Sequence, residues 1–307
     1  MPLHRLSRIT MGVPDVAATS AYYADFGLTH LGDGRFTTVD GGEQLKIVQA
    51  SRRRLEELVV GADTPDDIDR ITAALRRLDV PVVRDAHRLR AVDPGTEVTV
   101  TVEVDPRIAQ TAPAPVPYNA PGRAERPNVR APGVLREGVV RPRRLGHVVL
   151  GSTDQEASQR FFTEGIGFKV SDLVRGSAAF MRCSTDHHNV LVQQAPLTFL
   201  HHSSWQVDDV DQVGRGATRM LQGHPERHVW GLGRHQVGSN FFWYLRDPAG
   251  NFSEYYSDMD CIVDDQLWSP GVWEGARALY NWGPPVPPSF LRPDDLAALM
   301  TGSHDAS

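Results

Sequence analysis

The sequence predicts an α+β protein built from four β-α-β-β-β modules that are paired in two domains. One observation is that a strand, a helix and several short strands recur in this order four times along the 307 residues. Another is that LGHVVLGSTDQEASQRFF (145–162) aligns without gaps onto LSRITMGVPDVAATSAYY (6–23), sharing a leucine, a glycine and an aspartate. A chain of this length also exceeds what one core usually organises.

The first domain is expected at residues 1–110. An apolar run at 9–13 indicates a strand, a turn at Pro14 begins a helix, and Gly27 ends that helix. A second helix begins near Thr64 and runs to about residue 78. The further strands of this half are expected at 35–39, 44–49, 55–62, 81–84 and 97–104.

Residues 111–142 are rich in proline and lack hydrophobic periodicity, which indicates an extended linker. The second domain is expected at 143–262, where one residue more than in the first half precedes the helix-ending Gly167. A fourth module contains a helix to about Leu221 and strands near 227–230, 240–245 and 252–257. The tryptophan-rich arm at 263–307 is expected to pack on the domain surface or, alternatively, to form a rim over a substrate pocket.

Composition excludes several classes of partner. The net charge of -6 argues against nucleic acid or an anionic membrane surface as the main partner. No stretch approaches the roughly 20 apolar residues of a membrane span, and no early segment reads as a signal peptide. Only two cysteines occur, Cys183 and Cys261, and they have no paired spacing that suggests zinc, so a reduced, cytoplasmic setting is expected.

The two halves differ at positions where chemistry is expected. Arg8 stands at the position that matches His147, and Glu57 stands at the position that matches His202. Glu254, in the last strand of the second half, has no glutamate as its counterpart in the first half. Two histidines and one carboxylate are typical of a non-haem Fe(II) site with open positions, although zinc or manganese fits the same ligands. The sequence therefore predicts a metal site in the second half only.

A predicted hairpin at 233–256 carries several fixed positions. They are His235, Trp243-Tyr244, Asp247-Pro248, Gly250 and Glu254. In these residues the second half resembles the type I extradiol ring-cleaving dioxygenases of the vicinal oxygen chelate superfamily. The resemblance covers residues 1–290 in architecture, and its motifs concentrate in 145–256.

The resemblance implies that each domain forms an open mixed β-barrel around a cavity. It also implies that His147, His202 and Glu254 are the metal ligands. His202 is preferred to His201 because the residues after it match those after His147. His201 is then expected to point to the opposite face of its strand.

Catalytic roles for His188, His235 and Tyr244 follow from the same resemblance. His188 matches the acid-base histidine of the family, although the spacing of His187 is about as good. His235 and Tyr244 are expected to hydrogen-bond the substrate oxygens. Trp230 stands where relatives that act on carboxylated catechols often carry an arginine, which favours an apolar ring substituent.

The implied function is that of an Fe(II)-dependent dioxygenase, with Mn(II) as an alternative metal. Such an enzyme inserts both atoms of O2 into a catecholic ring and yields a 2-hydroxymuconic semialdehyde-type product during the degradation of aromatic compounds. Catechol and O2 are the expected partners, and assembly as a homo-oligomer is expected because these scaffolds commonly assemble. A glyoxalase-like or isomerase enzyme and a binding or resistance protein are the alternatives. His188 and Tyr244 argue against the former, and the complete ligand set argues against the latter.

Overall fold

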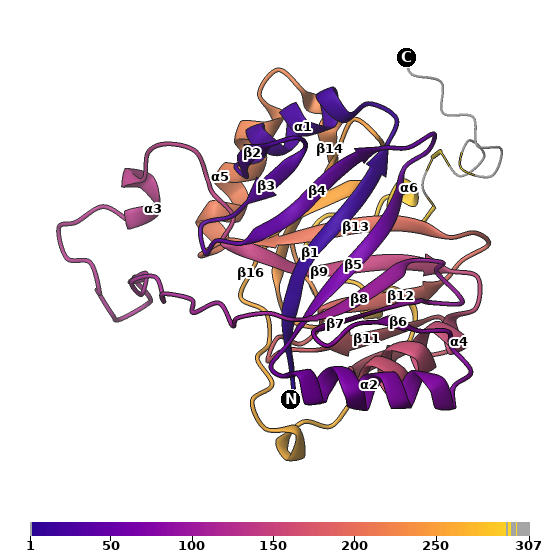
Figure 1. Ribbon diagram of the computed structural model, residues 1–307. Helices are drawn as coiled ribbons and strands as arrows, with labels where there is room; N and C mark the ends of the chain where they lie inside the picture. The colour runs from indigo at the N-terminus through magenta and orange to yellow at the C-terminus, as the bar shows by residue number, and fades with distance from the viewer. Residues whose placement is uncertain (1, 293, 296–298, 300–307) are drawn as a thin grey trace.

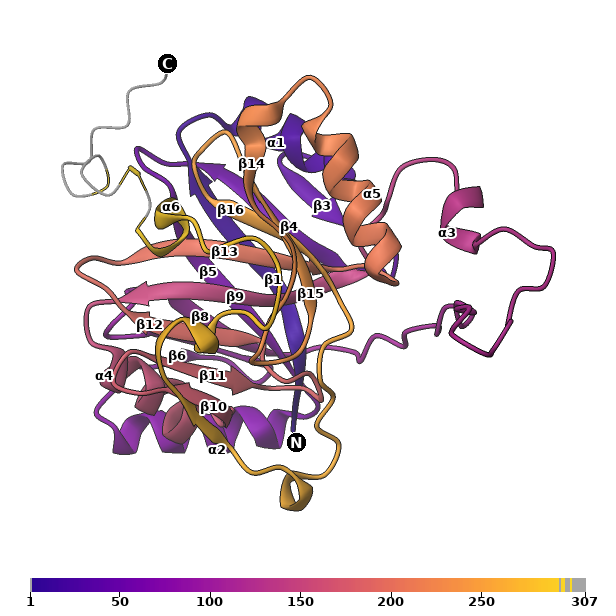
Figure 2. The ribbon, with the colours of Figure 1, turned by 180° about the vertical axis from the view of Figure 1, so that it is seen from behind.

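A computed structural model describes residues 2–292, 294, 295 and 299 and shows two mixed β-sheets with helices packed beside them (Figures 1 and 2). The predicted α+β class and the two domains are confirmed, since one sheet of 8 strands comes from the first half and one of 9 strands from the second. Among the described residues, none of the helices combines the length and the apolar character needed to cross a membrane.

The first sheet has the strand order β2-β3-β4-β1-β5-β8-β7-β6. Its strands are β1 (Leu3–Val13), β2 (Thr29–Gly32), β3 (Arg35–Thr37), β4 (Glu43–Gln49), β5 (Arg54–Ala62), β6 (Val83–Arg84), β7 (Arg88–Val92) and β8 (Thr99–Val104). The helices of this half are α1 (Val16–Asp25) and α2 (Pro65–Arg77). The strands β2 and β7 were not predicted; β2 is mostly exposed and lacks the alternation of apolar and polar residues that marks a half-buried strand.

The second sheet has the order β14-β15-β16-β13-β9-β12-β11-β10-β17. Its strands are β9 (Arg144–Ser152), β10 (Lys169–Val174), β11 (Ala178–Arg182), β12 (Val190–Gln194), β13 (Phe199–Gln206), β14 (His228–Arg234), β15 (Phe241–Arg246), β16 (Phe252–Ser257) and β17 (Gly271–Trp273). Its helical segments are α4 (Gln155–Arg160), η1 (Phe161–Ile166), α5 (Val210–Leu221), η2 (Pro225–Arg227), η3 (Asp265–Leu267), η4 (Gly275–Ala278) and α6 (Pro288–Leu291).

The chain between the two sheets projects from the body of the protein and contains one short helix, α3 (Pro132–Leu135) (Figure 1). At the other end, the predicted arm crosses the face of the second sheet, and β17 adds to the edge of that sheet beside β10 (Figure 2). Residues 293, 296–298 and 300–307 of this arm lie outside the described residues.

The one-residue difference between the aligned halves has a structural explanation. Segment η1 is a π-helical turn that continues α4, and it ends at Gly167, whose φ is 99°. A π-helical turn accommodates one extra residue inside a helix. The first half lacks this residue, and α1 leads directly to Gly27 without such a turn.

Helices of the two halves also make contacts across the boundary between the halves. Phe26, after α1, stacks on Tyr255 of β16 with ring centroids 3.8 Å apart, and the Tyr255 hydroxyl donates to the Phe26 carbonyl at 2.6 Å. Helix α2 lies beside η1, where the chain approaches so closely that a Cβ on Gly165 would come within 2.7 Å of Leu75. The apolar core is therefore continuous across both halves.

The predicted hairpin is confirmed, with a turn between β15 and β16 that is organised by Asp247. This buried carboxylate accepts hydrogen bonds from the backbone N–H groups of Ala249 (3.0 Å) and Asn251 (2.9 Å). Gly250 has a φ of 91°, which a residue with a side chain rarely adopts. Burial raises the pKa of Asp247 to about 6 despite these hydrogen bonds.

Asp247 makes stability depend on pH in a predictable direction. Its folded-state pKa lies above the unfolded value of 3.8, so the folded protein binds this proton more tightly. Relative to Asp247→Asn, the wild type should lose up to about 3 kcal/mol of unfolding free energy as the pH rises from about 4 to about 7. Denaturant unfolding of both proteins across this range measures the difference. A difference that does not change with pH would contradict the assignment.

Candidate metal centre

Three adjacent strands of the second sheet bring His147, His202 and Glu254 together. They are β9, β13 and β16, which are neighbours in the order β16-β13-β9. Ser204 of β13 pairs with His147 on one side and with Glu254 on the other. Cross-strand partners share a face of the sheet, and His202 lies two residues from Ser204 on the same face. The register alone therefore directs the three side chains to one place.

The distances between the three side chains fit a metal site. Nε2 of His147 lies 3.1 Å from Oε2 of Glu254 and 3.3 Å from Nε2 of His202, and the third separation is 3.7 Å. Bonds of about 2.1 Å to one metal place neighbouring ligand atoms about 3.0 to 3.4 Å apart, depending on the coordination geometry. Among the described residues, this is the only group of histidines, cysteines and carboxylates close enough to hold an ion.

Glu254 shows why this cluster requires a cation. Its side chain has no exposed surface, and Oε2 lacks a hydrogen-bond partner. Burial alone would raise the pKa of Glu254, but contacts with His147 and His235 hold it well below the ordinary value. The group is therefore a buried carboxylate, whose charge needs a positive partner. A divalent metal bound by these residues would supply that charge.

The first half carries an ion pair at the matching positions. Thr10 pairs with Glu57 in the first sheet just as Val149 pairs with His202 in the second. Arg8 and Glu57, which match His147 and His202, lie 3.7 Å apart as guanidinium and carboxylate. An arginine cannot ligate a cation, so this half has an internal positive charge where the second half has ligands.

The expectation that His201 points away from His202 is wrong. The pairing of β13 with β9 shifts between Leu200 and His202, so His201 lies in a β-bulge and the alternation of faces is interrupted. Both histidines line the same cavity, with their Nδ1 atoms 2.7 Å apart.

The contact between His201 and His202 determines which ring nitrogen of His202, the proposed ligand, carries a proton. Nε2 of His201 lies 2.7 Å from the Phe290 carbonyl, which only accepts, so His201 is protonated there and accepts at Nδ1. His202 must then donate from Nδ1, which leaves a lone pair on its Nε2, directed to the other ligands. Burial and the neighbouring His201 lower the pKa of His202 well below its ordinary value, so it is held neutral, as a metal ligand must be.

The remaining predicted residues border the same cavity. Its lining consists of His147, Val149, Phe180, His188, Leu191, Gln193, His201, His202, His235, Val237, Tyr244, Ala278, Leu279 and Phe290. His188 is therefore at the cavity, whereas His187 lies behind it and is not among the lining residues. Burial and the neighbouring His147 lower the pKa of His188 well below its ordinary value.

His235 and Tyr244 form a hydrogen-bonded pair at the cavity. Nδ1 of His235 donates to the Leu279 carbonyl at 2.5 Å, so its Nε2 accepts from the Tyr244 hydroxyl at 2.8 Å. Burial and the nearby Glu254 raise the pKa of Tyr244 well above its ordinary value. Trp230 is not in the cavity wall; it packs behind Tyr244 with parallel rings 5.8 Å apart.

The C-terminal arm contributes residues that the sequence motifs do not mark. Ala278, Leu279 and Phe290 line the cavity. The Leu279 carbonyl accepts a hydrogen bond from His235, and the Phe290 carbonyl accepts one from His201. The arm therefore forms part of the wall of the cavity, which agrees with the alternative role as a rim. Backbone carbonyls carry no sequence signal, so no pattern could have identified these contacts.

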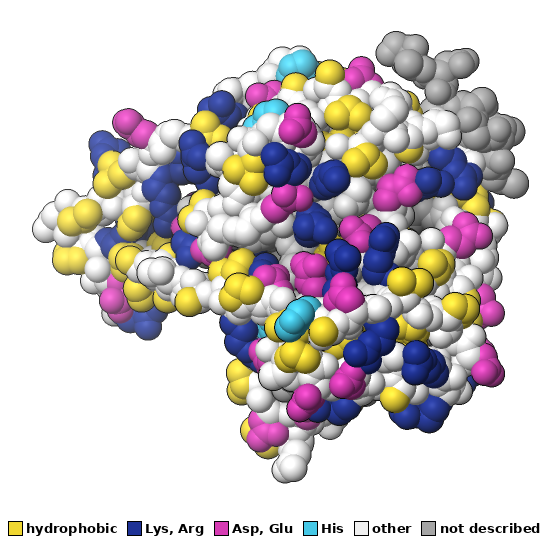
Figure 3. All heavy atoms as spheres, in the orientation of Figure 1, with side chains coloured by type: hydrophobic (Ala, Val, Ile, Leu, Met, Phe, Trp, Pro, Cys, Tyr) yellow, Lys and Arg dark blue, Asp and Glu magenta, His cyan; other side chains and the backbone are white. Residues whose placement is uncertain are grey.

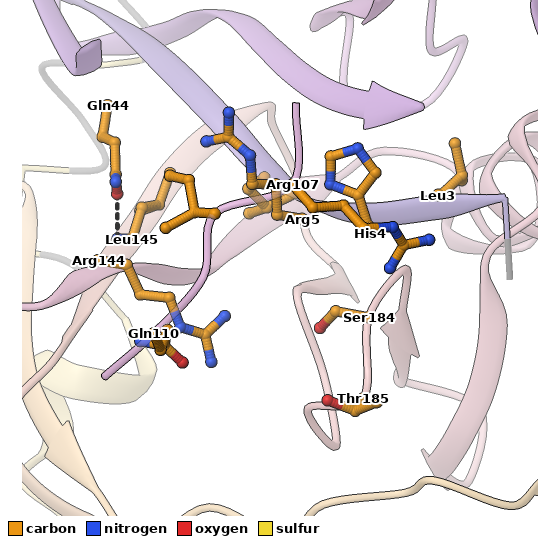
Figure 4. Close-up of a pocket in the computed structure, with 12 residues that line it drawn as sticks. Leu3, His4, Arg5, Gln44, Arg107, Gln110, Arg144, Leu145, Ser184 and Thr185 are labelled. Atoms are coloured by element: carbon orange, nitrogen blue, oxygen red, sulfur yellow. Dashed lines mark hydrogen bonds between the residues drawn. The ribbon is translucent and has the colours of Figure 1, made fainter. Parts of the chain in front are cut away.

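A second cavity, of about 290 Å³, lies where β1, the start of β9 and residues 107–110 after β8 meet (Figure 4). Three arginines line it, but each is paired with a carboxylate: Arg5 with Asp105, Arg107 with Asp63 and Arg144 with Asp186. The Gln44 side chain crosses between the halves here and accepts from the Leu145 backbone at 2.6 Å (Figure 4). None of the proposed ligands borders this cavity, so the chemistry is assigned to the histidine-lined one.

Comparison with known proteins agrees with this geometry. Residues 144–255 match the family model of the Glyoxalase/Bleomycin resistance protein/Dioxygenase superfamily. The chain is 32% identical to metapyrocatechase 2 of Cupriavidus necator, covering 94% of this chain and 92% of that protein. It is 24% identical to the manganese-dependent 2,3-dihydroxybiphenyl 1,2-dioxygenase of Geobacillus genomosp. 3, covering 80% of each chain.

A solved structure shares the fold over nearly the whole chain. The Mn(II)-bound glyoxalase from Novosphingobium aromaticivorans has a TM-score of 0.73 and 26% identity, covering 93% of this chain and 94% of that one. The superfamily thus includes both oxygenases and glyoxalases on this scaffold. Since the identity to a metapyrocatechase extends through both halves, the chain belongs to the extradiol ring-cleaving dioxygenases of the glyoxalase, bleomycin resistance protein and dioxygenase superfamily.

Proposed function

We propose that this chain is an Fe(II)-dependent dioxygenase that inserts both atoms of O2 into a catecholic ring. Ring opening beside the two hydroxyls would give a 2-hydroxymuconic semialdehyde-type product in the degradation of aromatic compounds. The observation that supports this most is the convergence of two buried histidine nitrogens and one buried carboxylate at a cavity that also contains His188, His235 and Tyr244. His147 and His202 line this cavity, and Glu254 lies behind them.

The metal would be held by His147, His202 and Glu254. When bound, it would acidify the catechol hydroxyls and bring substrate and O2 to one centre. A set of two histidines and one carboxylate is typical of Fe(II) oxygenases, which favours iron. Mn(II) remains the alternative, because one relative is named as manganese-dependent.

The protein's own residues would bind and protonate the substrate. The Tyr244 hydroxyl, which donates to Nε2 of His235 at 2.8 Å, would turn to donate to one substrate oxygen, and Nε2 of His235 would then accept from the substrate hydroxyl. His188 would take a proton from a substrate hydroxyl and return it later in the reaction, as a general base and then a general acid. The apolar lining residues, such as Val149, Phe180 and Leu191, favour a catechol with an apolar ring substituent.

Two broader proposals concern the setting of the enzyme. The cysteines Cys183 and Cys261 are both free, which fits a reducing compartment such as the cytoplasm. Assembly into a homo-oligomer is supported by the projecting linker, where apolar and basic side chains gather (Figure 3). Val134 and Leu135 are 71% and 59% exposed there. With five arginines and two glutamates, residues 111–142 carry a charge of +3, which leaves -9 for the rest of the chain. A second copy of the chain would therefore attract this linker.

Anaerobic reconstitution tests the proposed reaction. Protein loaded with Fe(II) or, separately, with Mn(II) is mixed with aerated catechol, 3-methylcatechol or a carboxylated catechol. We expect O2 uptake in equal amount to substrate loss, with the appearance of a yellow ring-fission product. Metal-loaded protein that binds catechols but consumes no O2 would contradict the proposal. Turnover of a 2-oxoaldehyde thiol adduct by the same sample would instead favour a glyoxalase-like activity.

A further inference from the structure

Three buried side chains form a row that leads from the edge of the second sheet to the cavity. Oδ2 of Asp172, in β10, lies 3.1 Å from Nε2 of His187. Nδ1 of His187 lies 3.1 Å from Nδ1 of His188. Asp172 and His187 are 4% and 0% exposed, and neither lines the cavity that His188 borders.

The protons in this row can be assigned from the chemistry of its ends. A carboxylate only accepts hydrogen bonds, so Nε2 of His187 carries a proton. In this tautomer of His187, Nδ1 offers a lone pair, and His188 donates to it from its own Nδ1. The second nitrogen of His188, Nε2, is therefore the one with a free lone pair. Because Nδ1 is occupied by His187, Nε2 is the nitrogen available to a molecule in the cavity.

The surroundings of the row hold it in this arrangement. The other carboxylate oxygen of Asp172, Oδ1, accepts from the backbone N–H of Gly271 in β17. The backbone N–H of His187 donates to the Asp260 carbonyl at 2.9 Å. The His187 ring also packs against Trp268 of the arm, with centroids 5.4 Å apart. The arm thus orients the far end of the row.

We infer that Asp172 and His187 are positioning residues, which hold His188 with its proton on Nδ1 and its Nε2 lone pair toward the cavity. This inference rests on the proposed function, in which His188 exchanges protons with the substrate. The row makes His188 a proton acceptor before it is a donor. A proton that leaves a substrate hydroxyl bonds to Nε2, and the same proton returns to a product oxygen, so the protein gains no net proton.

Replacing Asp172 by asparagine should reverse the direction of both hydrogen bonds in the row. Oδ1 of the new amide is kept toward the Gly271 N–H, because only an acceptor can face that donor. The amide NH2 then faces His187 and donates to Nε2, so His187 must carry its proton on Nδ1. His188 in turn must accept at Nδ1 and carry its proton on Nε2. The variant keeps the shape of the side chain and presents the cavity with a donor in place of a lone pair.

The experiment compares the wild type, Asp172→Asn and a matched control, Asp265→Asn. Asp265 is a half-exposed carboxylate on the arm, and its ion pairs are with Arg182 and Lys169. Nitrogen-15 NMR of histidine-labelled, zinc-loaded protein reports which ring nitrogen of His188 is protonated, with His188→Asn used for assignment. Steady-state kinetics with Fe(II)-loaded protein gives kcat and KM for catechol.

We expect His188 to be protonated on Nδ1 in the wild type and in Asp265→Asn, and on Nε2 in Asp172→Asn. In Asp172→Asn, kcat should fall by about 100-fold or more, while KM for catechol and metal content stay within about threefold. His188 protonated on Nε2 in the wild type would overturn the inference, and so would a kcat for Asp172→Asn within threefold of the wild type.

Two further features keep the test decisive. If Asp172→Asn does not fold, His187→Phe removes the acceptor while filling the space between Phe180 and Trp268, and it should lower kcat to a similar extent. The wild-type spectrum needs no turnover, so a protein that fails to oxidise catechols would contradict the proposed function while the spectrum still decides the state of His188.

Discussion

Glu254→Gln is expected to weaken Fe(II) and Mn(II) binding by more than about 100-fold and to abolish ring cleavage. The glutamine has nearly the same shape, but it lacks the charge that the buried site presents to a cation. Changes in groups that only hydrogen-bond a ligand already cost about 10- to 100-fold in affinity, and loss of a charged ligand costs more. Titration calorimetry with Mn(II) and metal analysis after dialysis measure the effect.

Glu57→Gln is the matched control, because Glu57 occupies the first-half position that corresponds to His202 and faces Arg8. This variant should bind metal as the wild type does. Its unfolding free energy should change little, since the Arg8–Glu57 pair is partly exposed. A Glu254→Gln protein that retains one equivalent of metal would show that the carboxylate is not a ligand.

His202→Ala is expected to lose metal binding, whereas His201→Ala should retain it with an affinity lowered about 10- to 100-fold. The two residues are adjacent and both reach the cavity, so their positions in the sequence do not show which of them binds the metal. They differ in direction: Nε2 of His202 faces His147 at 3.3 Å, and Nε2 of His201 faces the Phe290 carbonyl. Without His201, the proton on Nδ1 of His202 loses its acceptor, and the ring is less firmly oriented.

Calorimetry with Mn(II) at one pH, together with the far-ultraviolet circular dichroism of each protein, distinguishes lost ligation from lost folding. His224→Ala serves as the control, because His224 has a half-exposed side chain that pairs with the neighbouring Glu226. Loss of metal from His201→Ala with retention in His202→Ala would reverse the assignment of the ligand.

The architecture could be predicted from sequence patterns, and the place of the metal site from the resemblance that these patterns carry. The gap-free repeat predicts that the two halves share their strand register. The observed pairing agrees, because Thr10 pairs with Glu57 in the first half and the corresponding Val149 pairs with His202 in the second. The turn residues around Asp247 predicted a returning strand that carries Glu254, and the resemblance to the extradiol dioxygenases grouped this residue with His147 and His202. These features follow from local patterns, which a linear sequence records directly.

Which histidines of the two adjacent pairs reach the cavity depends on contacts that form only in the folded chain. The bulge at His201 brings both members of one pair to the cavity, and bulges have no fixed sequence pattern. His188 reaches the cavity while His187 is directed to Asp172, a residue from another strand. The carbonyl of Phe290 comes from the distant arm. Which nitrogen of a histidine holds a proton depends on the atom that it meets in space, and only the packed chain determines that contact.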